Sequence, residues 1–296
     1  MIIAAYTKGR KMLDTEVQNR IRQFNPWLLQ PNRADEFISR FIPGIYVQRD
    51  LEEISLTANR ANLVIGPRQS GKSTLIWHLL RPLAPDVLFL NMEDILVRTG
   101  CKAAIDLADH IRKDYPFIKA LFIDEIQHME ESGLFVKGLV DMKLDIPIFV
   151  TGSSSFNLAG RTRESLAGRA TRRRLLPFSM GELLRHVAAP NLAAARYEAE
   201  KIVEHQLTYG SYPAIYLCAS SHEKETLLND LVESLILRDA SDIFRIKRVD
   251  AFRKLLLLLA GQIGGLVNLS ELASICNVDV GTVSSYIEIL QESHVV

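Results

Sequence analysis

The chain has 296 residues, of which 48% are hydrophobic and 24% are charged, as in an ordinary globular protein. Its 35 basic and 35 acidic residues cancel, so the chain as a whole lacks the positive charge typical of nucleic-acid binders. Three widely separated cysteines exclude a disulfide framework. The N-terminal apolar stretch is too short for a signal peptide, and no apolar run is long enough to cross a bilayer. We therefore expect a soluble, cytoplasmic protein that does not enter a membrane.

The first half of the sequence alternates between short apolar runs and helical segments. This alternation is typical of a parallel sheet built from crossover units, which is an α/β fold. The runs are apolar on both faces, as expected of strands that helices cover on both sides. The expected strands are residues 61–66, 87–91, 119–124, 146–151 and 174–178.

From about Met180 onward, long helical segments replace the strands. The last part of the chain predicts two short helices joined by a tight turn, which is a helix-turn-helix unit. Ser270 is the expected N-cap of the first helix, and residues 281–291 form the second. The earlier helical segments are 193–207, 223–237 and 250–260.

Residues 66–74 read GPRQSGKST and directly follow an apolar run. They fit the pattern G-x-x-x-x-G-K-[ST], through Gly66, Gly71, Lys72 and Ser73. Glycines let backbone N–H groups curl around a polyphosphate, and the helix that begins near Gly71 adds its N-terminal dipole. Lys72 supplies a charge for the β and γ phosphates, and Ser73 supplies an oxygen ligand for Mg²⁺. A glycine-rich turn that fits by chance is the alternative, but the strand before and the helix after favour nucleotide binding.

Residues 121–127, LFIDEIQ, form an apolar run that ends in two adjacent carboxylates. Asp124 is placed to hold the water shell of Mg²⁺ opposite Ser73. Glu125 is placed to orient and deprotonate the attacking water. The alternative is a solvated acidic pair at the junction of a strand and a loop. No guanine-reading N-K-x-D motif is present, so the choice between nucleotides leans toward ATP.

A further run, IPIFVTGSSS, ends in small polar residues. In a nucleotide-hydrolysing sheet, such a residue senses the γ-phosphate through a hydrogen bond. Ser153 is our first candidate for this role and Ser154 our second. The alternative is a polar turn with a serine that caps the next helix.

Six arginines and one glutamate crowd residues 161–174. One of these arginines can act as a finger that reaches the γ-phosphate of a neighbouring subunit. The cluster can instead bind nucleic-acid phosphates, or it can be a solvated positive face. Arg169, which follows Leu-Ala-Gly just before the expected fifth strand, is favoured as the finger over Arg161 and Arg163.

Together, the motifs GPRQSGKST, LFIDEIQ, IFVTGSSS and LAGRA resemble those of the archaeal and bacterial AAA-type P-loop ATPases that carry a C-terminal helix-turn-helix. The resemblance covers roughly residues 40–296. It implies a parallel sheet of order 5-1-4-3-2, a helical lid, a C-terminal winged-helix or helix-turn-helix unit, and the use of ATP and Mg²⁺. It also implies metal ligands at Ser73 and Asp124, a base at Glu125, a sensor at Ser153 and a finger at Arg169. The implied phosphate-binding residues are Gly66, Pro67, Arg68, Gln69, Ser70, Gly71, Lys72, Ser73 and Thr74.

The resemblance also suggests how the chain divides. We expect an N-terminal helical segment, a P-loop ATPase domain, a helical lid and a helix-turn-helix, over residues 1–45, 46–180, 181–250 and 251–296. Pro213, in the lid segment YGSYP, resembles a proline that packs near the adenine, although a plain helix break explains it equally well. Relatives usually continue into a domain like a restriction endonuclease, so this chain is either a truncated piece or a short member.

Two functions follow from these features. The first is Mg²⁺-dependent ATP hydrolysis that drives a conformational cycle, either in a single subunit or in a homo-oligomer whose subunits share arginines. The alternative is a slow, nucleotide-gated switch that docks DNA or a protein through residues 251–296 and the arginines of 161–174. The second predicted helix of the C-terminal unit has no basic residue, which weakens DNA binding and favours a structural or protein-docking role. An aromatic residue near Tyr46 either lines the adenine pocket or packs in the core.

Overall fold

The computed structural model describes residues 13–52, 54, 56–153, 166–234 and 246–295. The chain divides into two compact units. The first consists of the residues up to Ile65 together with Gly71–Leu175, and the second of Gly66–Ser70 together with the residues from Leu176 onward.

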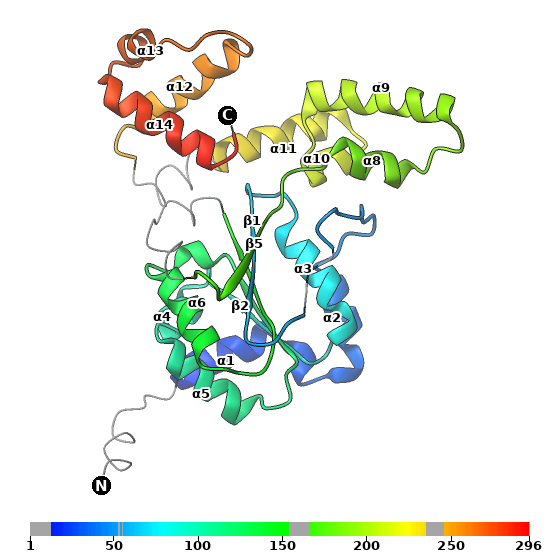
Figure 1. Ribbon diagram of the computed structural model, residues 1–296, viewed down its shortest axis with the longest axis vertical. Helices are drawn as coiled ribbons and strands as arrows, with labels where there is room; N and C mark the ends of the chain where they lie inside the picture. Colours follow the sequence, from blue (N-terminus) through cyan, green and yellow to red (C-terminus); the bar gives the residue numbers. More distant parts are fainter. Residues whose placement is uncertain (1–12, 53, 55, 154–165, 235–245, 296) are drawn as a thin grey trace. The chain divides into compact units, whose positions relative to one another are not determined.

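The first unit contains a five-stranded parallel sheet of order β2-β3-β4-β1-β5 (Figure 1). This is the predicted order 5-1-4-3-2, read from the other edge. The strands are β1 Ala61–Ile65, β2 Val87–Asn91, β3 Ala120–Asp124, β4 Ile148–Gly152 and β5 Ala170–Arg174. The helices are α1 Thr15–Phe24, η1 Pro26–Leu28, η2 Pro31–Arg33, α2 Ala34–Ser39, α3 Lys72–Leu80, η3 Arg81–Leu83, α4 Ile95–Gly100, α5 Ala104–Asp114, η4 Ile126–His128 and α6 Ser132–Asp141.

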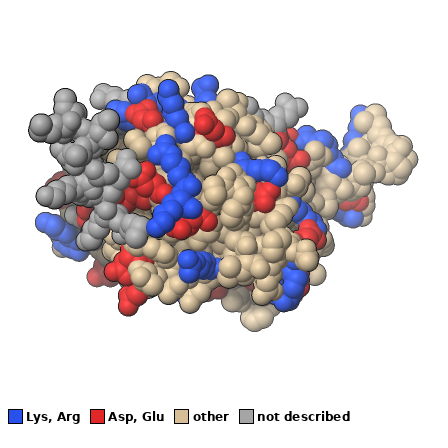
Figure 2. Space-filling model, turned by 90° about the horizontal axis from the view of Figure 1, so that it is seen from below, with Lys and Arg blue, Asp and Glu red and all other residues tan. Residues whose placement is uncertain are grey.

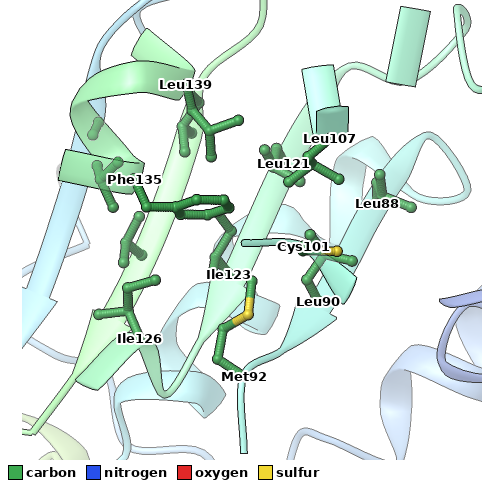
Figure 3. Close-up of a cluster of buried hydrophobic side chains, with 14 of the residues drawn as sticks. Leu88, Leu90, Met92, Cys101, Leu107, Leu121, Ile123, Ile126, Phe135 and Leu139 are labelled. Atoms are coloured by element: carbon green, nitrogen blue, oxygen red, sulfur yellow. The ribbon is translucent and has the colours of Figure 1, made fainter. Parts of the chain in front are cut away.

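Helices cover both faces of the sheet, because successive side chains of each strand point to opposite faces. On one face, strand residues such as Leu121 and Ile123 pack with side chains of α1, α4, α5 and α6. Figure 3 shows this core, in which Phe135 and Leu139 of α6 lie beside the strand residues. On the other face, strand residues such as Phe122 pack with α2, α3 and η1. The two apolar faces inferred from the sequence are thus confirmed for the inner strands.

The predicted fifth strand, 174–178, is wrong by four residues. The strand is β5, Ala170–Arg174, which pairs with β1 only and lies at an edge of the sheet. An edge strand is less covered than an inner one, so it accommodates three arginines, of which two are partly exposed and Arg174 is exposed. The apolar residues that suggested a strand follow it. Leu175 is buried and donates its N–H to Ile65 O at 2.8 Å, and Pro177 has no N–H to continue the ladder.

The opposite edge strand, β2, is closed by side chains of the N-terminal segment. The Asn25 side chain accepts the N–H of Phe89 at 2.7 Å and donates to the carbonyl of the same residue at 2.8 Å. The indole N–H of Trp27 donates to Val87 O at 2.8 Å. Asn25 and Trp27 are buried, so side chains replace the strand that would otherwise satisfy these backbone groups.

The second unit is helical. Its first four helices are α8 Met180–Val187, α9 Leu192–Tyr209, α10 Pro213–Leu217 and α11 Ser221–Ser234. α8 begins with a capping box, in which the Ser179 hydroxyl accepts from the Glu182 N–H and the Glu182 carboxylate accepts from the Ser179 N–H. α9 contains the predicted helical segment 193–207 and is longer than it at both ends.

Three more helices, α12 Val249–Gly261, α13 Leu269–Cys276 and α14 Val280–Glu292, share a core built around Phe252, Val283 and Leu290. The short connection between α13 and α14 matches the predicted tight turn. The predicted N-cap Ser270 is wrong, because the Asn268 side chain caps α13 by accepting from the N–H groups of Ser270 and Glu271.

Charges on the surface are mixed. Over the face shown in Figure 2, Lys and Arg side chains lie among Asp and Glu side chains, as expected from equal numbers of basic and acidic residues. Within the part of the chain that the structure describes, none of the helices combines the length and the apolar character needed to span a bilayer.

Candidate functional site

The phosphate-loop motif connects β1 to α3. Gly71 is the N-cap of α3 and has φ of 90° and ψ of 22°, a left-handed conformation that glycine adopts without steric cost. Gln69 also has a positive φ, of 58°. Lys72 is the first residue of α3 and is buried, with 4% of its surface exposed. The loop therefore ends at a helix N-terminus, where N–H groups without helical partners favour an anion.

Ser73 and Asp124 meet at the carboxyl end of the sheet. The Ser73 hydroxyl, in the first turn of α3, donates to Oδ1 of Asp124 at 2.8 Å. The hydroxyl of Thr151, in β4, donates to the same oxygen. Asp124 is the last residue of β3. The fold thus brings together the two residues predicted to handle Mg²⁺, which lie 51 residues apart in sequence.

The surroundings of Asp124 disfavour its negative charge. Burial, followed by the negative charge of Glu125, raises the pKa of its carboxyl group to about 6. Hydrogen bonds from Thr151 and Ser73 and the charge of Lys72 lower this pKa and so offset part of the rise. A cation beside the two carboxylates would relieve this cost. A hydroxyl and a carboxylate are also the oxygen ligands that Mg²⁺ prefers, so Ser73 and Asp124 fit the ion.

Such an ion would also need more oxygen ligands than Ser73 and Asp124 supply. Among the described residues, no three His, Cys, Asp or Glu side chains are grouped as a metal site would require. Mg²⁺ is usually held by one or two protein oxygens together with phosphates and waters. This donor set therefore suits an ion that arrives with a nucleotide.

Glu125 directly follows β3 and has an unusual backbone conformation. Its φ of 55° and ψ of 45° are in the left-handed region, which costs energy for a residue with a side chain. Its N–H donates to the Thr151 hydroxyl at 3.2 Å. Its carboxylate oxygen Oε2 accepts a hydrogen bond from the amide of Gln127. The backbone N–H of Glu125 and its carboxylate are thus each hydrogen-bonded to a neighbouring side chain.

The first sensor candidate, Ser153, follows β4 and is buried. Its backbone N–H donates to Oε1 of Gln127 at 3.0 Å, and Gln127 in turn donates to Glu125. Ser154, Arg161 and Arg163 lie outside the described residues. The predicted roles of all four residues stay predictions.

Sequence reasoning missed Thr151 and Gln127. Thr151 was counted as part of an apolar strand, although a hydroxyl at the end of such a strand is itself a signal. Gln127 belongs to the motif LFIDEIQ, which predicts roles for its two carboxylates only. Thr151 lies 27 residues from Asp124 in sequence. Only the order of the strands, which places β4 beside β3, reveals the contact between these two side chains.

Arg169 lies at the other end of the sheet. Its carbonyl accepts from the N–H of Ala61, the first residue of β1, whereas the phosphate loop follows the last residue, Ile65. The five residues of β1 span about 13 Å at ~3.3 Å per residue. The Arg169 guanidinium donates to Asp141 Oδ1 at 2.7 Å and is partly exposed. The structure therefore does not bring Arg169 to the acidic pair of its own chain.

Two further candidates have local partners. The Tyr46 ring stacks on His78 of α3, with ring centroids 3.9 Å apart, and its hydroxyl donates to Glu52 at 3.0 Å. Pro213 is the first residue of α10 in the second unit, a position that suits its fixed φ and missing N–H. Any contact of these two residues with a nucleotide stays a prediction.

Comparison with known proteins agrees with this geometry. Residues 58–184 match the family described as AAA domain. This match spans the whole sheet but less than half of the chain, so it shows a similarity to AAA domains over that segment. Residues 200–296 match a domain of unknown function (DUF8612). The Walker-type ATPase of Pyrococcus abyssi has a similar structure, with a TM-score of 0.50 and 15% identity over 79% of this chain and 84% of that one, which supports the fold alone.

Two curated relatives are uncharacterized proteins. One, from Methanocaldococcus jannaschii, is 25% identical over 77% of this chain. The other, from Haemophilus influenzae, is 26% identical over 78% of this chain. The matched regions span 52% and 60% of these relatives, so this chain corresponds to little more than half of their length. The AAA domain gives the chain a nucleotide-binding fold, and its finer chemistry follows from the residues themselves.

Proposed function

We propose that the chain binds ATP with Mg²⁺ and hydrolyses it to ADP and phosphate. The observation that carries this proposal is the hydrogen bond from Ser73 to Asp124, with Glu125 next in sequence. In ATPases with this fold, a hydroxyl from the phosphate loop and a carboxylate from the end of another strand of the sheet are the groups that face the metal. Glu125 supplies a second carboxylate beside them.

Each residue has a separate role in this proposal. The loop Gly66–Thr74 binds the phosphates through its N–H groups, and Lys72 adds a positive charge. Ser73 and Asp124 hold Mg²⁺, which neutralises the charge that develops on the phosphate oxygens. Glu125 orients a water molecule and accepts its proton. Ser153, at the end of β4, senses the γ-phosphate.

Three further roles, those of arginine finger, lid and docking unit, belong to residues outside the phosphate loop and the acidic pair. Because Arg169 lies at the far end of β1 from the phosphate loop, its predicted role as a finger requires a second copy of the chain. The helices α8–α11 are proposed to form the lid, with Pro213 near the adenine. The C-terminal helices α12–α14 are proposed to dock a protein partner, since α14 has no basic residue for DNA phosphates.

Equilibrium binding and turnover test this function together. We expect ATP to bind with Mg²⁺ more tightly than in EDTA, and phosphate to be released only with Mg²⁺. Lys72→Ala should abolish binding, whereas Lys102→Ala, which removes an exposed lysine from the same unit, should leave it unchanged. Failure of the unchanged chain to bind any nucleotide would overturn the proposal. Tight binding without turnover would replace the hydrolase with the nucleotide-gated switch.

A further inference from the structure

Gln127 connects the ends of two neighbouring strands. This residue lies in η4, just after β3. Its Nε2 donates to Oε2 of Glu125, and its Oε1 accepts from the backbone N–H of Ser153, after β4, at 3.0 Å. The chemistry determines the amide orientation. A backbone N–H only donates and an ionised carboxylate only accepts, so the amide oxygen must face Ser153 and the NH₂ must face Glu125.

Glu125 depends on such restraint to work as a base. A glutamate side chain has several rotatable bonds, and fixing it in one arrangement costs conformational entropy. Its backbone is already held in a left-handed conformation, where the N–H donates to Thr151. Gln127 adds a restraint at the carboxylate. With Oε2 engaged by Gln127, the second oxygen of Glu125 remains the one suited to accept a proton from water.

We propose that Gln127 is a positioning residue, which holds the Glu125 carboxylate in the arrangement that activates water and couples it to the end of β4. This inference rests on the proposed ATP hydrolysis. The coupling follows from the Ser153 contact, because a shift of the backbone at the predicted sensor moves Gln127 and therefore Glu125. Gln127 acts only through Glu125 and contributes no proton transfer of its own.

Replacement of Gln127 by methionine tests the proposal. Gln127→Met keeps the length of the side chain and removes both hydrogen bonds. We expect kcat for ATP to fall about 10- to 100-fold, the scale of a misplaced catalytic group, with KM changed less than about twofold. Gln18→Met is the matched control. The Gln18 side chain is also partly buried and hydrogen-bonded to the main chain, where it donates to the carbonyl of Leu13 at 2.7 Å. This variant should keep the parent kcat.

Two further variants separate positioning from a general structural role. Gln127→Glu keeps an acceptor for the Ser153 N–H but places a carboxylate against Glu125, so it should lose at least as much activity as Gln127→Met. In a Glu125→Gln background, Gln127→Met should change the residual turnover less than about twofold, because the residue it serves is already gone.

Several results would overturn the proposal. A Gln127→Met variant with parent kcat would do so alone, as would loss of ATP binding in that variant, which would indicate a structural role. An equal loss in the parent and Glu125→Gln backgrounds would show that Gln127 acts independently of Glu125. Absence of turnover in the unchanged chain would remove the proposed function and this inference with it, whereas turnover that ignores Gln127 would remove the inference only.

Discussion

Replacement of Asp124 by asparagine should stabilise the nucleotide-free protein. The pKa of Asp124 rises from 3.8 to about 6 through burial and the charge of Glu125, so the folded state disfavours its ionised form. A shift of about two units corresponds to about 3 kcal/mol. Because the residue keeps partial contact with solvent at the strand end, we expect a gain of about 1 to 3 kcal/mol at pH 7.5. Asparagine retains the oxygen that accepts from Ser73 and Thr151.

The sign of the pH dependence follows from linkage. The folded protein holds a proton on Asp124 at pH values where the unfolded chain has lost it, so rising pH destabilises the parent protein between about pH 4 and pH 6. The advantage of Asp124→Asn should therefore be largest above pH 7, about half as large near pH 5, and close to zero below pH 4.

Urea unfolding in EDTA measures this advantage from pH 5 to pH 8. Asp230→Asn, at an exposed position of α11, is the control and should change the free energy of unfolding by less than about 0.5 kcal/mol. Asp124→Asn that is less stable than the parent at pH 7.5, or a difference that does not shrink toward pH 5, would refute the reasoning. Mg²⁺ with ATP should reverse the order by stabilising the parent alone.

Three other predictions concern separate parts of the molecule. Asn25→Ala removes the groups that pair with the N–H and carbonyl of Phe89. It should lower the free energy of unfolding by about 2 to 5 kcal/mol. The control Gln23→Ala, at an exposed position, should lower it by less than about 0.5 kcal/mol. Equal urea midpoints for the two variants would contradict this. Burial raises the pKa of the Cys101 thiol to about 12, so iodoacetamide at pH 8 should label it only after unfolding, as mass spectrometry would show. Labelling of Cys101 in the folded protein would be evidence against its burial. If Arg169 works across subunits, specific ATPase activity should rise with protein concentration and Arg169→Ala should remove the rise, whereas a flat profile unaffected by the variant would eliminate the finger.

The inner strands could be predicted from sequence because their physical environment is uniform. Helices cover both faces of β3, β4 and β1, so nearly every residue there is apolar and the runs are visible. The edge strand β5 breaks this rule. It pairs on one side only, and its arginines remain partly exposed, so the apolar residues after it attracted the prediction instead.

The candidate site was predictable where its residues lie in one continuous motif. The phosphate loop and the Asp124–Glu125 pair each occupy a short segment with a fixed spacing. Thr151 and Gln127 were missed because their roles arise from contacts across β3 and β4, which depend on the strand order rather than on local sequence. At α13, Asn268 and Ser270 are both good cap residues, and only the backbone conformation distinguishes them.

The most direct test of the account is steady-state release of phosphate from ATP with Mg²⁺, by the unchanged chain and by Glu125→Gln. We predict that the variant binds ATP as the parent does and loses turnover by about 100-fold or more, the contribution expected of a general base. Equal turnover by the two proteins would contradict the role of Glu125. Tight binding with negligible turnover in both would contradict ATP hydrolysis as the function of the chain.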